Sequence, residues 1–278
     1  MAVSLTTLSA GCSDDNSPAK SLTPESALEE TTPVVPRNPD KNAYFGDLHV
    51  HSSYSFDAFL FGVRAEPDDA YRFAQGAKLN HVGGFEMQLK TPLDFFSVTD
   101  HGEMLGHYRA MADPSHALSK HPDARAATQA KTREELQTAF ALAKEWIRPG
   151  PRQGELNDAA VTQSSWAEII DSANRHNKPG EFTTFIGYEY TTTADLDNLH
   201  RNVIFAADKA PKAPFSRLDS ENPEDLWLWM DWLRDQGIDS LAIPHNSNAS
   251  NGQMFSLTDS SEKALTKKYS ELRTQNEK

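Results

Sequence analysis

The sequence is poor in the features that mark disulfide-rich proteins and membrane proteins. It has a single cysteine among 278 residues, so no disulfide can form within the chain. Its mean hydropathy is −0.62, and no run approaches the ~18 consecutive apolar residues that a membrane-spanning helix needs. These absences exclude a disulfide scaffold and a bundle of membrane helices. They leave a globular chain that is long enough to bury a core.

Positive charge is also scarce. The sequence has 27 Lys and Arg residues against 40 Asp and Glu residues, which gives a formal net charge of −13. A negative field repels phosphate backbones, so we expect no nucleic-acid partner. A small anionic substrate remains compatible with this charge, because bound divalent cations would reverse the local sign.

The one cysteine lies in a segment that resembles a bacterial lipobox. Small residues precede Cys12, although no Lys or Arg precedes the short apolar run as in an ordinary signal peptide. Residues 13–42 are rich in Ser, Thr, Pro, Asp and Glu, a composition typical of a disordered tether. We therefore expect residues 1–42 to be a lipidated segment and tether that anchors a periplasm-facing protein in the cell envelope. The alternative is an accidental cysteine in a cytoplasmic protein.

Beyond this segment, short apolar runs alternate with helical patterns. The predicted strands are 43–50, 93–99, 182–190, 200–206 and 238–243, and the predicted helices are 67–75, 132–147, 164–176 and 223–236. We also expect a hairpin at 79–89 and a surface insertion at 102–131. Strand–helix repetition predicts a parallel sheet or barrel over residues 43–255, followed by a polar helical tail at 256–278.

The densest motif places His49 and His51 two residues apart in the first predicted strand. Residues i and i+2 of a strand point to the same face, so both imidazoles can reach one metal ion. Leu48 and Val50 alternate with them, which indicates that the opposite face is buried and that the histidines line a cavity. The alternative is a pair of histidines on a solvent-facing strand.

Other residues of metal-binding type fall at the ends of later predicted strands. His101 and His245 directly follow two of these strands, and His200 opens another. Glu189 ends an apolar run, where a buried carboxylate is costly unless it is paired or bound to a metal. In α/β barrels the rim formed by strand C-termini carries the chemistry, so this placement favours a site.

Two aspartates accompany these motifs. Asp57 lies six residues after His51 and is either an oxygen ligand or a turn residue. Asp100 either orients the neighbouring His101 ring, binds a metal ion itself or caps a helix. The remaining histidines are interpreted as surface or loop residues, with His107 held open because it lies near His101: His81, His107, His116, His121 and His176.

Taken in order, the motifs His-x-His, Asp, Thr-Asp-His-Gly, Gly-Tyr-Glu, His and Pro-His resemble the metal motifs of the PHP (polymerase and histidinol phosphatase) superfamily. The flanking sequence at 44–57 and 244–248 is closer still to a PHP-like bacterial group, domain-of-unknown-function family 3604. Each motif is weak alone. The resemblance, which runs from about residue 43 to residue 255, is carried by their order and their placement at strand ends.

This resemblance implies an α/β fold, a distorted (β/α)7 TIM-like barrel, with two to three divalent metal ions, zinc or manganese. The implied ligands divide among three ions: His49 and His51 bind the first, Glu189 bridges the first and second, His200 and His245 bind the second, and Asp57 and His101 bind the third. By proximity to the motifs, Asp100 and Arg64 are candidates for catalysis, and Arg201 and Asn246 for substrate contacts.

The sequence departs from the superfamily pattern at its end. That pattern closes with an Asp-x-His motif, whereas no histidine follows His245 here. We therefore expect a barrel that is incomplete at the C-terminus, in a fragment of a longer protein that on its own is inactive.

Three functions fit these observations. The first is a metal-dependent hydrolase acting on a small, anionic phosphoester. The second is an ester or amide hydrolase on the same scaffold, because clustered metals activate water for either reaction. The third is a surface-anchored, non-catalytic lipoprotein whose metal site is degenerate.

Overall fold

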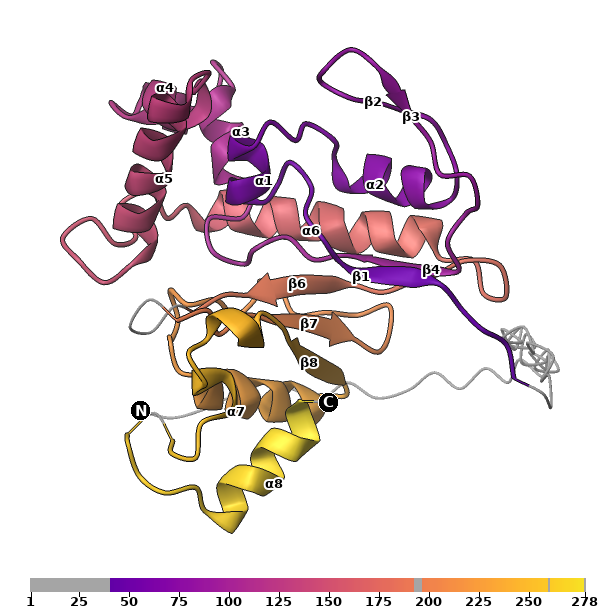
Figure 1. Ribbon diagram of the computed structural model, residues 1–278, viewed down its shortest axis with the longest axis vertical. Coiled ribbons are helices and arrows are strands. Elements are labelled where there is room, and N and C mark those ends of the chain that lie inside the picture. Colours follow the sequence, from indigo (N-terminus) through magenta and orange to yellow (C-terminus); the bar gives the residue numbers. More distant parts are fainter. Residues whose placement is uncertain (1–40, 193–196, 260, 278) are drawn as a thin grey trace, which may run out of the picture. The chain divides into compact units, whose positions relative to one another are not determined.

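The computed structural model describes residues 41–192, 197–259 and 261–277 (Figure 1). These residues belong to one compact unit that spans 35–278. Cys12 and the expected tether up to residue 40 lie outside the described residues. No helix in the described part of the chain combines the length and the apolar character needed to cross a bilayer.

The first sheet is parallel and begins with the His-x-His strand. Strand β1 (Gly46–Val50) pairs with β4 (Phe95–Val98), which in turn pairs with the short β5 (Thr183–Thr184). Between β1 and β4 the chain forms the expected hairpin, since β2 (Leu79–Asn80) and β3 (Glu86–Met87) are antiparallel.

The second sheet is antiparallel, which corrects the expectation of an all-parallel arrangement. Strands β6 (Gly187–Tyr190), β7 (Arg201–Phe205) and β8 (Ser240–Pro244) pair in that order, and β7 runs opposite to both neighbours. No helix separates β6 from β7 in the described residues, so the chain turns back without the crossover that parallel strands require. The fold is therefore mixed α/β, and the described strands form no closed barrel.

Hydrogen bonds join the two sheets at the ends of β4 and β6. The backbone N–H of Glu189 donates to the Asp100 carbonyl, and the N–H of Gly102 donates to the Glu189 carbonyl, both at 2.9 Å. A side-chain contact also links the two sheets, because the amide of Asn202 on β7 donates to the Leu48 carbonyl of β1 at 2.8 Å. This last bond links β1 directly to β7, although the two strands belong to different sheets.

Helices cover the outer side of these strands. In Figure 1, α2 (Pro67–Ala74) and α6 (Ala159–His176) lie above the strands, and α7 (Pro223–Arg234) lies below them. Trp166 of α6 packs edge-on against Tyr188 of β6, which points outward because it alternates with the inward-pointing Glu189. The main core is formed where these aromatic side chains meet.

A second, smaller core lies in a group of helices beside the strands: α1 (Phe56–Leu60), α3 (His107–Ala112), the 3-10 helix η1 (Ala117–Lys120), α4 (Ala124–Thr128) and α5 (Arg133–Ile147). Tyr108 and Trp146 are buried in it. The stretch 102–131 is thus not a surface insertion. His107, which the sequence left open, is 1% exposed, because α3 packs between α1 and α4.

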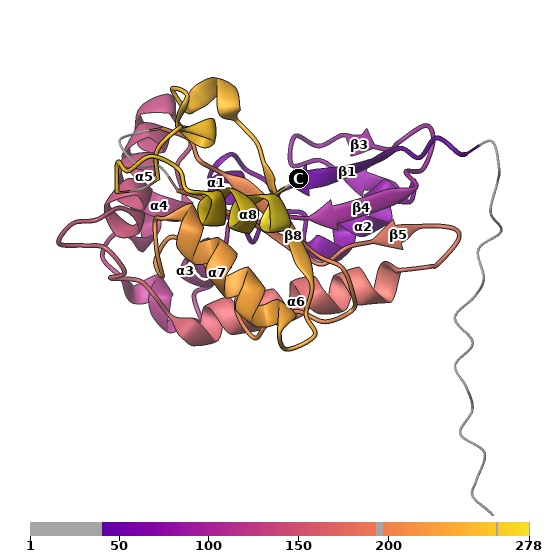
Figure 2. The same cartoon turned by 90° about the horizontal axis from the view of Figure 1, so that it is seen from below.

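The C-terminal stretch packs onto the same unit. After the 3-10 helices η3 (Ser247–Ala249) and η4 (Gln253–Phe255), helix α8 (Lys267–Asn276) lies next to α7, as both views show (Figures 1 and 2). The buried Glu277 contacts Arg201 of β7, so the expected polar tail is helical and contributes to the core of residues 35–278.

Candidate metal centre

One edge of the strands gathers the predicted ligands, and strand direction explains how. His49 lies next to the end of β1, His101 follows β4, Glu189 lies near the end of β6, and His245 follows β8. Because β7 is reversed, its beginning lies at this same edge, and His200 directly precedes it. The antiparallel turn thus puts a histidine from a strand start among residues from strand ends.

The centre of the group is the Glu189 carboxylate, whose side chain is 1% exposed. Oε2 lies 2.7 Å from His51 Nε2 and 3.2 Å from His49 Nε2. Oε1 lies 2.5 Å from His200 Nδ1 and 3.1 Å from His245 Nε2. Each carboxylate oxygen is therefore shared by a different pair of imidazoles.

Asp57 forms a second carboxylate centre beside the first. It lies in the first turn of α1, where both of its oxygens are 3.1 Å from His51 Nδ1. His101 Nε2 is 3.6 Å from Asp57 Oδ2, and the opposite ring nitrogen of His101 contacts the Thr191 hydroxyl. The His51 ring consequently bridges the two carboxylates.

Mutual contact shifts the protonation of these groups. Burial opposes the ionisation of Glu189, but the charge of His101 and the hydrogen bonds from the other histidines hold its pKa well below the ordinary value. Burial likewise opposes the protonation of His101, yet the charge of Glu189 and the contact with the Asp57 carboxylate raise its pKa to about 9. For His200, burial prevails and lowers the pKa.

These residues form three groups that could each hold a metal ion, with candidate donor atoms within 4.8 Å of one another: His49, His51 and Glu189; His51, Asp57 and His101; and Glu189, His200 and His245. All seven predicted ligands are thus brought together. Two ligands at about 2.0–2.1 Å from a tetrahedral zinc ion lie roughly 3.3 Å apart. The N–O separations of 2.5–3.2 Å around Glu189 are shorter by about 0.1–0.8 Å, so these side chains would move apart by up to about 0.8 Å to admit an ion.

The chemistry of the donor set also fits metal binding. The rings of the five histidines are close, with centroids 4.2 Å apart for His49 and His245 and 4.7 Å for His51 and His101. Such imidazoles would repel one another if all were protonated, and two carboxylates cannot neutralise five positive charges. Neutral imidazoles supply lone pairs instead, and mixed imidazole and carboxylate ligation suits zinc or manganese.

The residues predicted for catalysis lie beside the cluster without facing it. Asp100 is fully buried, and burial raises its pKa to about 6. Its carboxylate accepts from the backbone N–H and the hydroxyl of Ser52 at 2.5 and 2.6 Å, which fixes the chain just after His51. The guanidinium of Arg64 donates to the carbonyls of Phe59 and Val63 and stacks on the Phe59 ring.

The residues predicted for substrate contact also lie apart from the ligand atoms. Arg201 is 2% exposed, and its guanidinium forms an ion pair with Glu277 on the outer side of β7. Asn246 follows His245 directly, is exposed, and adopts a left-handed backbone conformation with φ 59°. Of these two, only Asn246 is exposed to solvent.

Sequence reasoning missed three residues at the site. Thr191 contacts His101, and its place two residues after Glu189, on the same face of the chain, is the signal that could have identified it. Glu103 is buried two residues after His101. Gly187 is required by close packing, because a Cβ there would lie 2.7 Å from the Ser97 hydroxyl oxygen.

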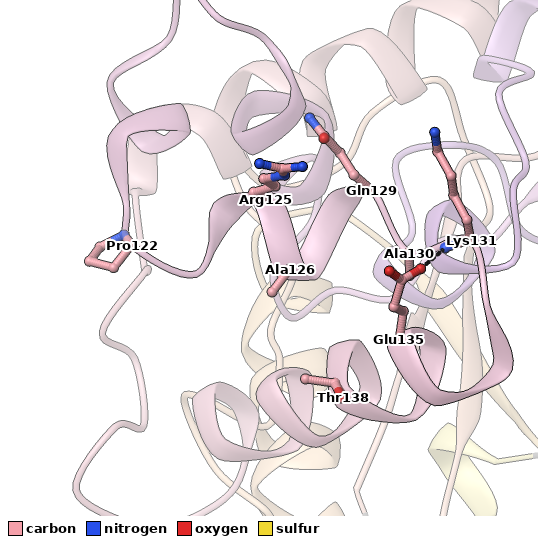
Figure 3. Close-up of a pocket in the computed structure, with 8 residues that line it drawn as sticks. All are labelled: Pro122, Arg125, Ala126, Gln129, Ala130, Lys131, Glu135 and Thr138. Carbon is pink, nitrogen blue, oxygen red and sulfur yellow. Dashed lines mark hydrogen bonds between the residues drawn. The ribbon is translucent and has the colours of Figure 1, made fainter.

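A cavity of about 260 Å³ adjoins the cluster, and His101 and His200 form part of its wall. A larger hollow of about 610 Å³ lies between α4 and α5 (Figure 3). It is lined by residues such as Arg125, Lys131 and Thr138 and by none of the predicted ligands. The smaller cavity is therefore the one that connects with the candidate chemistry.

The fold and the site define a mixed α/β protein with a histidine–carboxylate cluster that could hold metal ions. More particularly, the chain belongs to the family described as "Protein of unknown function (DUF3604)", whose family model matches residues 38–278. No curated protein matched the chain. No solved structure matched it either.

Proposed function

We propose that this protein is a metal-dependent hydrolase that acts on a small phosphoester at the histidine–carboxylate cluster. The observation that supports this most is Glu189, a buried carboxylate with two imidazoles on each oxygen. Two or three divalent ions bound there would lower the pKa of a coordinated water and stabilise the charge of an attacked phosphoryl group. The family assignment is compatible with this activity and does not specify it.

Some of the protein's residues would bind the metal ions, and others would orient the ligand side chains. A neutral imidazole offers one lone pair, while its other nitrogen carries a proton to donate. If His51 Nε2 binds the ion beside Glu189, its Nδ1–H donates to Asp57, which then orients the ring. Two ions, one on each side of Glu189, are thus supported more directly than a third at Asp57 and His101.

The TIM-like barrel of the PHP superfamily is part of this proposal. It is supported by the backbone hydrogen bonds that join the ends of β4 and β6 and by the Asn202–Leu48 hydrogen bond, which links β7 to β1. In such a barrel the cluster would lie at the rim formed by the strand ends.

The first experiment measures metal content. Protein purified from medium with zinc or manganese should hold about two ions per chain by elemental analysis, because neutral imidazoles and carboxylates are good ligands for both. Glu189→Gln and the double variant His49→Ala, His51→Ala should lose most of this metal. His81→Ala serves as the control, since His81 is exposed in the β2–β3 hairpin and should leave the metal content unchanged.

The second experiment compares phosphomonoesters with carboxylate esters and amides. Metal-dependent turnover of the phosphomonoesters, lost in Glu189→Gln, is the expected result. Turnover of carboxylate esters or amides alone would replace the proposal with ester or amide hydrolysis on this scaffold. A protein that binds no metal would instead be a non-catalytic surface protein with a degenerate site.

A further inference from the structure

The cavity beside the cluster combines three kinds of wall. Its most buried part is polar and includes His101, Glu103 and Arg217, with the partly buried His200 beside them. Its middle is apolar, with Phe56 and Ile147. Its outer part carries Lys144 and Arg148. At about 260 Å³ it is slightly smaller than the ~300–1,000 Å³ of sites for drug-sized ligands, so it suits a small molecule.

One face of α5 builds the outer half of this cavity. Phe140, Ala143, Lys144 and Ile147 have the i, i+3, i+4, i+7 spacing that places side chains along a single helix face, and Arg148 follows as the C-cap residue. Ala143 and Ile147 are buried, Phe140 and Arg148 are half-buried, and Lys144 is exposed. The buried side chains of this face are therefore apolar, and its cationic side chains lie closer to solvent.

The two cations have no acidic partner among the residues that the structure describes. Neither Lys144 nor Arg148 forms a side-chain hydrogen bond or ion pair there, although the chain has a net charge of −13. Arg152, four residues after Arg148, contacts three carboxylates. Two neighbouring cations without a carboxylate at the mouth of a cavity are available to an anionic ligand.

The deep part of the cavity has the opposite character. Both carboxylate oxygens of Glu103 are buried without a hydrogen-bond partner in the described residues, and Oε1 is 3.9 Å from His101 Nδ1. Arg217 also lines the cavity, but its guanidinium is paired with Glu221. A second negative charge on the ligand, besides the scissile group, is therefore better placed at Lys144 and Arg148 than beside Glu103. The ligand atoms between these two ends would contact Phe56 and Ile147.

We infer that the substrate has an aromatic or other apolar body with a second anionic group, a carboxylate or phosphate, at the end remote from the metal-proximal ester. This inference rests on the proposed function, whose cluster would hold the scissile group. Lys144 and Arg148 bind the remote anion, and the apolar body lies against Phe56, Phe140 and Ile147. The two cations are thus specificity-determining residues, with no part in the chemical step.

The test measures binding as well as turnover. The probes are phenylphosphonate and 4-carboxyphenylphosphonate, which resemble the proposed substrate and are not hydrolysed, titrated calorimetrically against the metal-loaded protein. The carboxylate should tighten binding about tenfold or more, as expected for hydrogen bonds between charged groups. Lys144→Met and Arg148→Met keep much of the apolar stem and should reduce this difference to about twofold or less.

Two further variants serve as controls. Arg125→Met removes an exposed cation from the larger hollow between α4 and α5 (Figure 3) and should leave the tenfold difference intact. Phe140→Ala should weaken both probes by a similar factor, because it shortens the apolar wall. Circular dichroism checks that each variant remains folded.

Equal affinity of the two probes for the unaltered protein would overturn the inference, as would an unchanged carboxylate preference in Lys144→Met and Arg148→Met. These results are separable from failure of the proposed function. Turnover of phenyl phosphate without a preference for 4-carboxyphenyl phosphate rejects only the remote anion site. Probe binding with the expected preference but no turnover of either phosphate ester rejects the hydrolase and retains the site.

Discussion

At the scale of single residues, buried histidines have two different roles in this protein. Those around Glu189 contact carboxylate oxygens, so a cation could bind between an imidazole and a carboxylate. His107 instead contacts only backbone groups. Its Nε2 accepts from the Asp158 N–H at 3.0 Å, and its Nδ1 lies 3.1 Å from the Leu105 carbonyl, which assigns the proton to Nδ1. His107 thus joins the start of α6 to α3 in its neutral form.

His107 should make the folded protein less stable in mild acid. Burial lowers its pKa below the ordinary value of 6.5, so the folded state disfavours the proton that the unfolded chain accepts. The stabilisation is therefore present above about pH 6.5 and is lost as the pH falls, by at most about 1.4 kcal/mol per pH unit. Urea unfolding between pH 5 and 8 should show a shallower pH dependence in His107→Gln.

The matched control for this measurement is His81→Gln, which changes an exposed histidine in the β2–β3 hairpin. It should reproduce the pH dependence of the unaltered protein. If His107→Gln did the same, the Asp158 hydrogen bond would not depend on a neutral ring.

At the scale of elements, the direction of β7 determines where His200 lies, and the packing of α8 determines the environment of Arg201. Reversal of β7 brings His200 to the edge where β6 and β8 end, and it turns Arg201 outward toward Trp227 of α7. Glu277, at the end of α8, forms an ion pair with Arg201 and also accepts from Trp227 Nε1 at 3.0 Å. A buried ion pair therefore connects the last helix to the strand that begins at the cluster.

Removing one member of this ion pair should destabilise the folded protein. Glu277→Ala leaves the buried Arg201 charge uncompensated, so we expect the free energy of unfolding to fall by about 3–5 kcal/mol. The double variant Glu277→Leu, Arg201→Met should recover much of that loss, because neither charge then remains buried. Urea denaturation followed by tryptophan fluorescence measures both.

Glu271→Ala is the control on the same helix, because Glu271 forms an exposed ion pair with Lys267 and should change stability little. A Glu277→Ala protein as stable as this control would show that Arg201 is solvated. It would also restore Arg201 as a candidate for substrate contact.

At the scale of the whole molecule, the cluster joins segments that are distant in the chain. His51 and Glu189 are 138 residues apart, and His245 and Glu189 are 56 apart. An ion held by these side chains links β1, β6 and β8, and it binds the folded state alone because the unfolded chain does not assemble the site.

Metal removal should therefore lower the melting temperature. A ligand present at about 100 times its Kd stabilises the folded state by roughly 2.7 kcal/mol. Calorimetry before and after dialysis against a chelator should show this loss, and added zinc or manganese should reverse it. In Glu189→Gln the melting temperature should not respond to either treatment, whereas a response equal to that of the unaltered protein would locate the ion elsewhere.

Anchoring is the remaining property of the whole protein, and it depends on a segment outside the described residues. We propose that Cys12 carries lipid in the native host, as the lipobox-like sequence before it predicts. Growth with labelled palmitate should label the protein, and Cys12→Ser should abolish the label. An unlabelled protein recovered from the cytoplasm would support the alternative of an accidental cysteine.

The sequence by itself determined most elements and the membership of the cluster. Periodicity predicted the strands around His49, His101 and Glu189, because apolar alternation and strand ends are local properties. It also predicted α5, whose start is marked by a capping box formed by Thr132 and Glu135. These features need only a few neighbouring residues, so they can be recognised without the fold.

Only the tertiary structure decided how those elements face one another. The reversed β7, the buried His107 and the Arg201–Glu277 pair all depend on partners far along the chain. Strand direction follows from where each connection can pack, and the environment of a charge follows from what covers it. For this reason the same sequence that indicates seven candidate ligands does not indicate that the two oxygens of Glu189 each contact two histidines, or that Lys144 and Arg148 line the adjacent cavity.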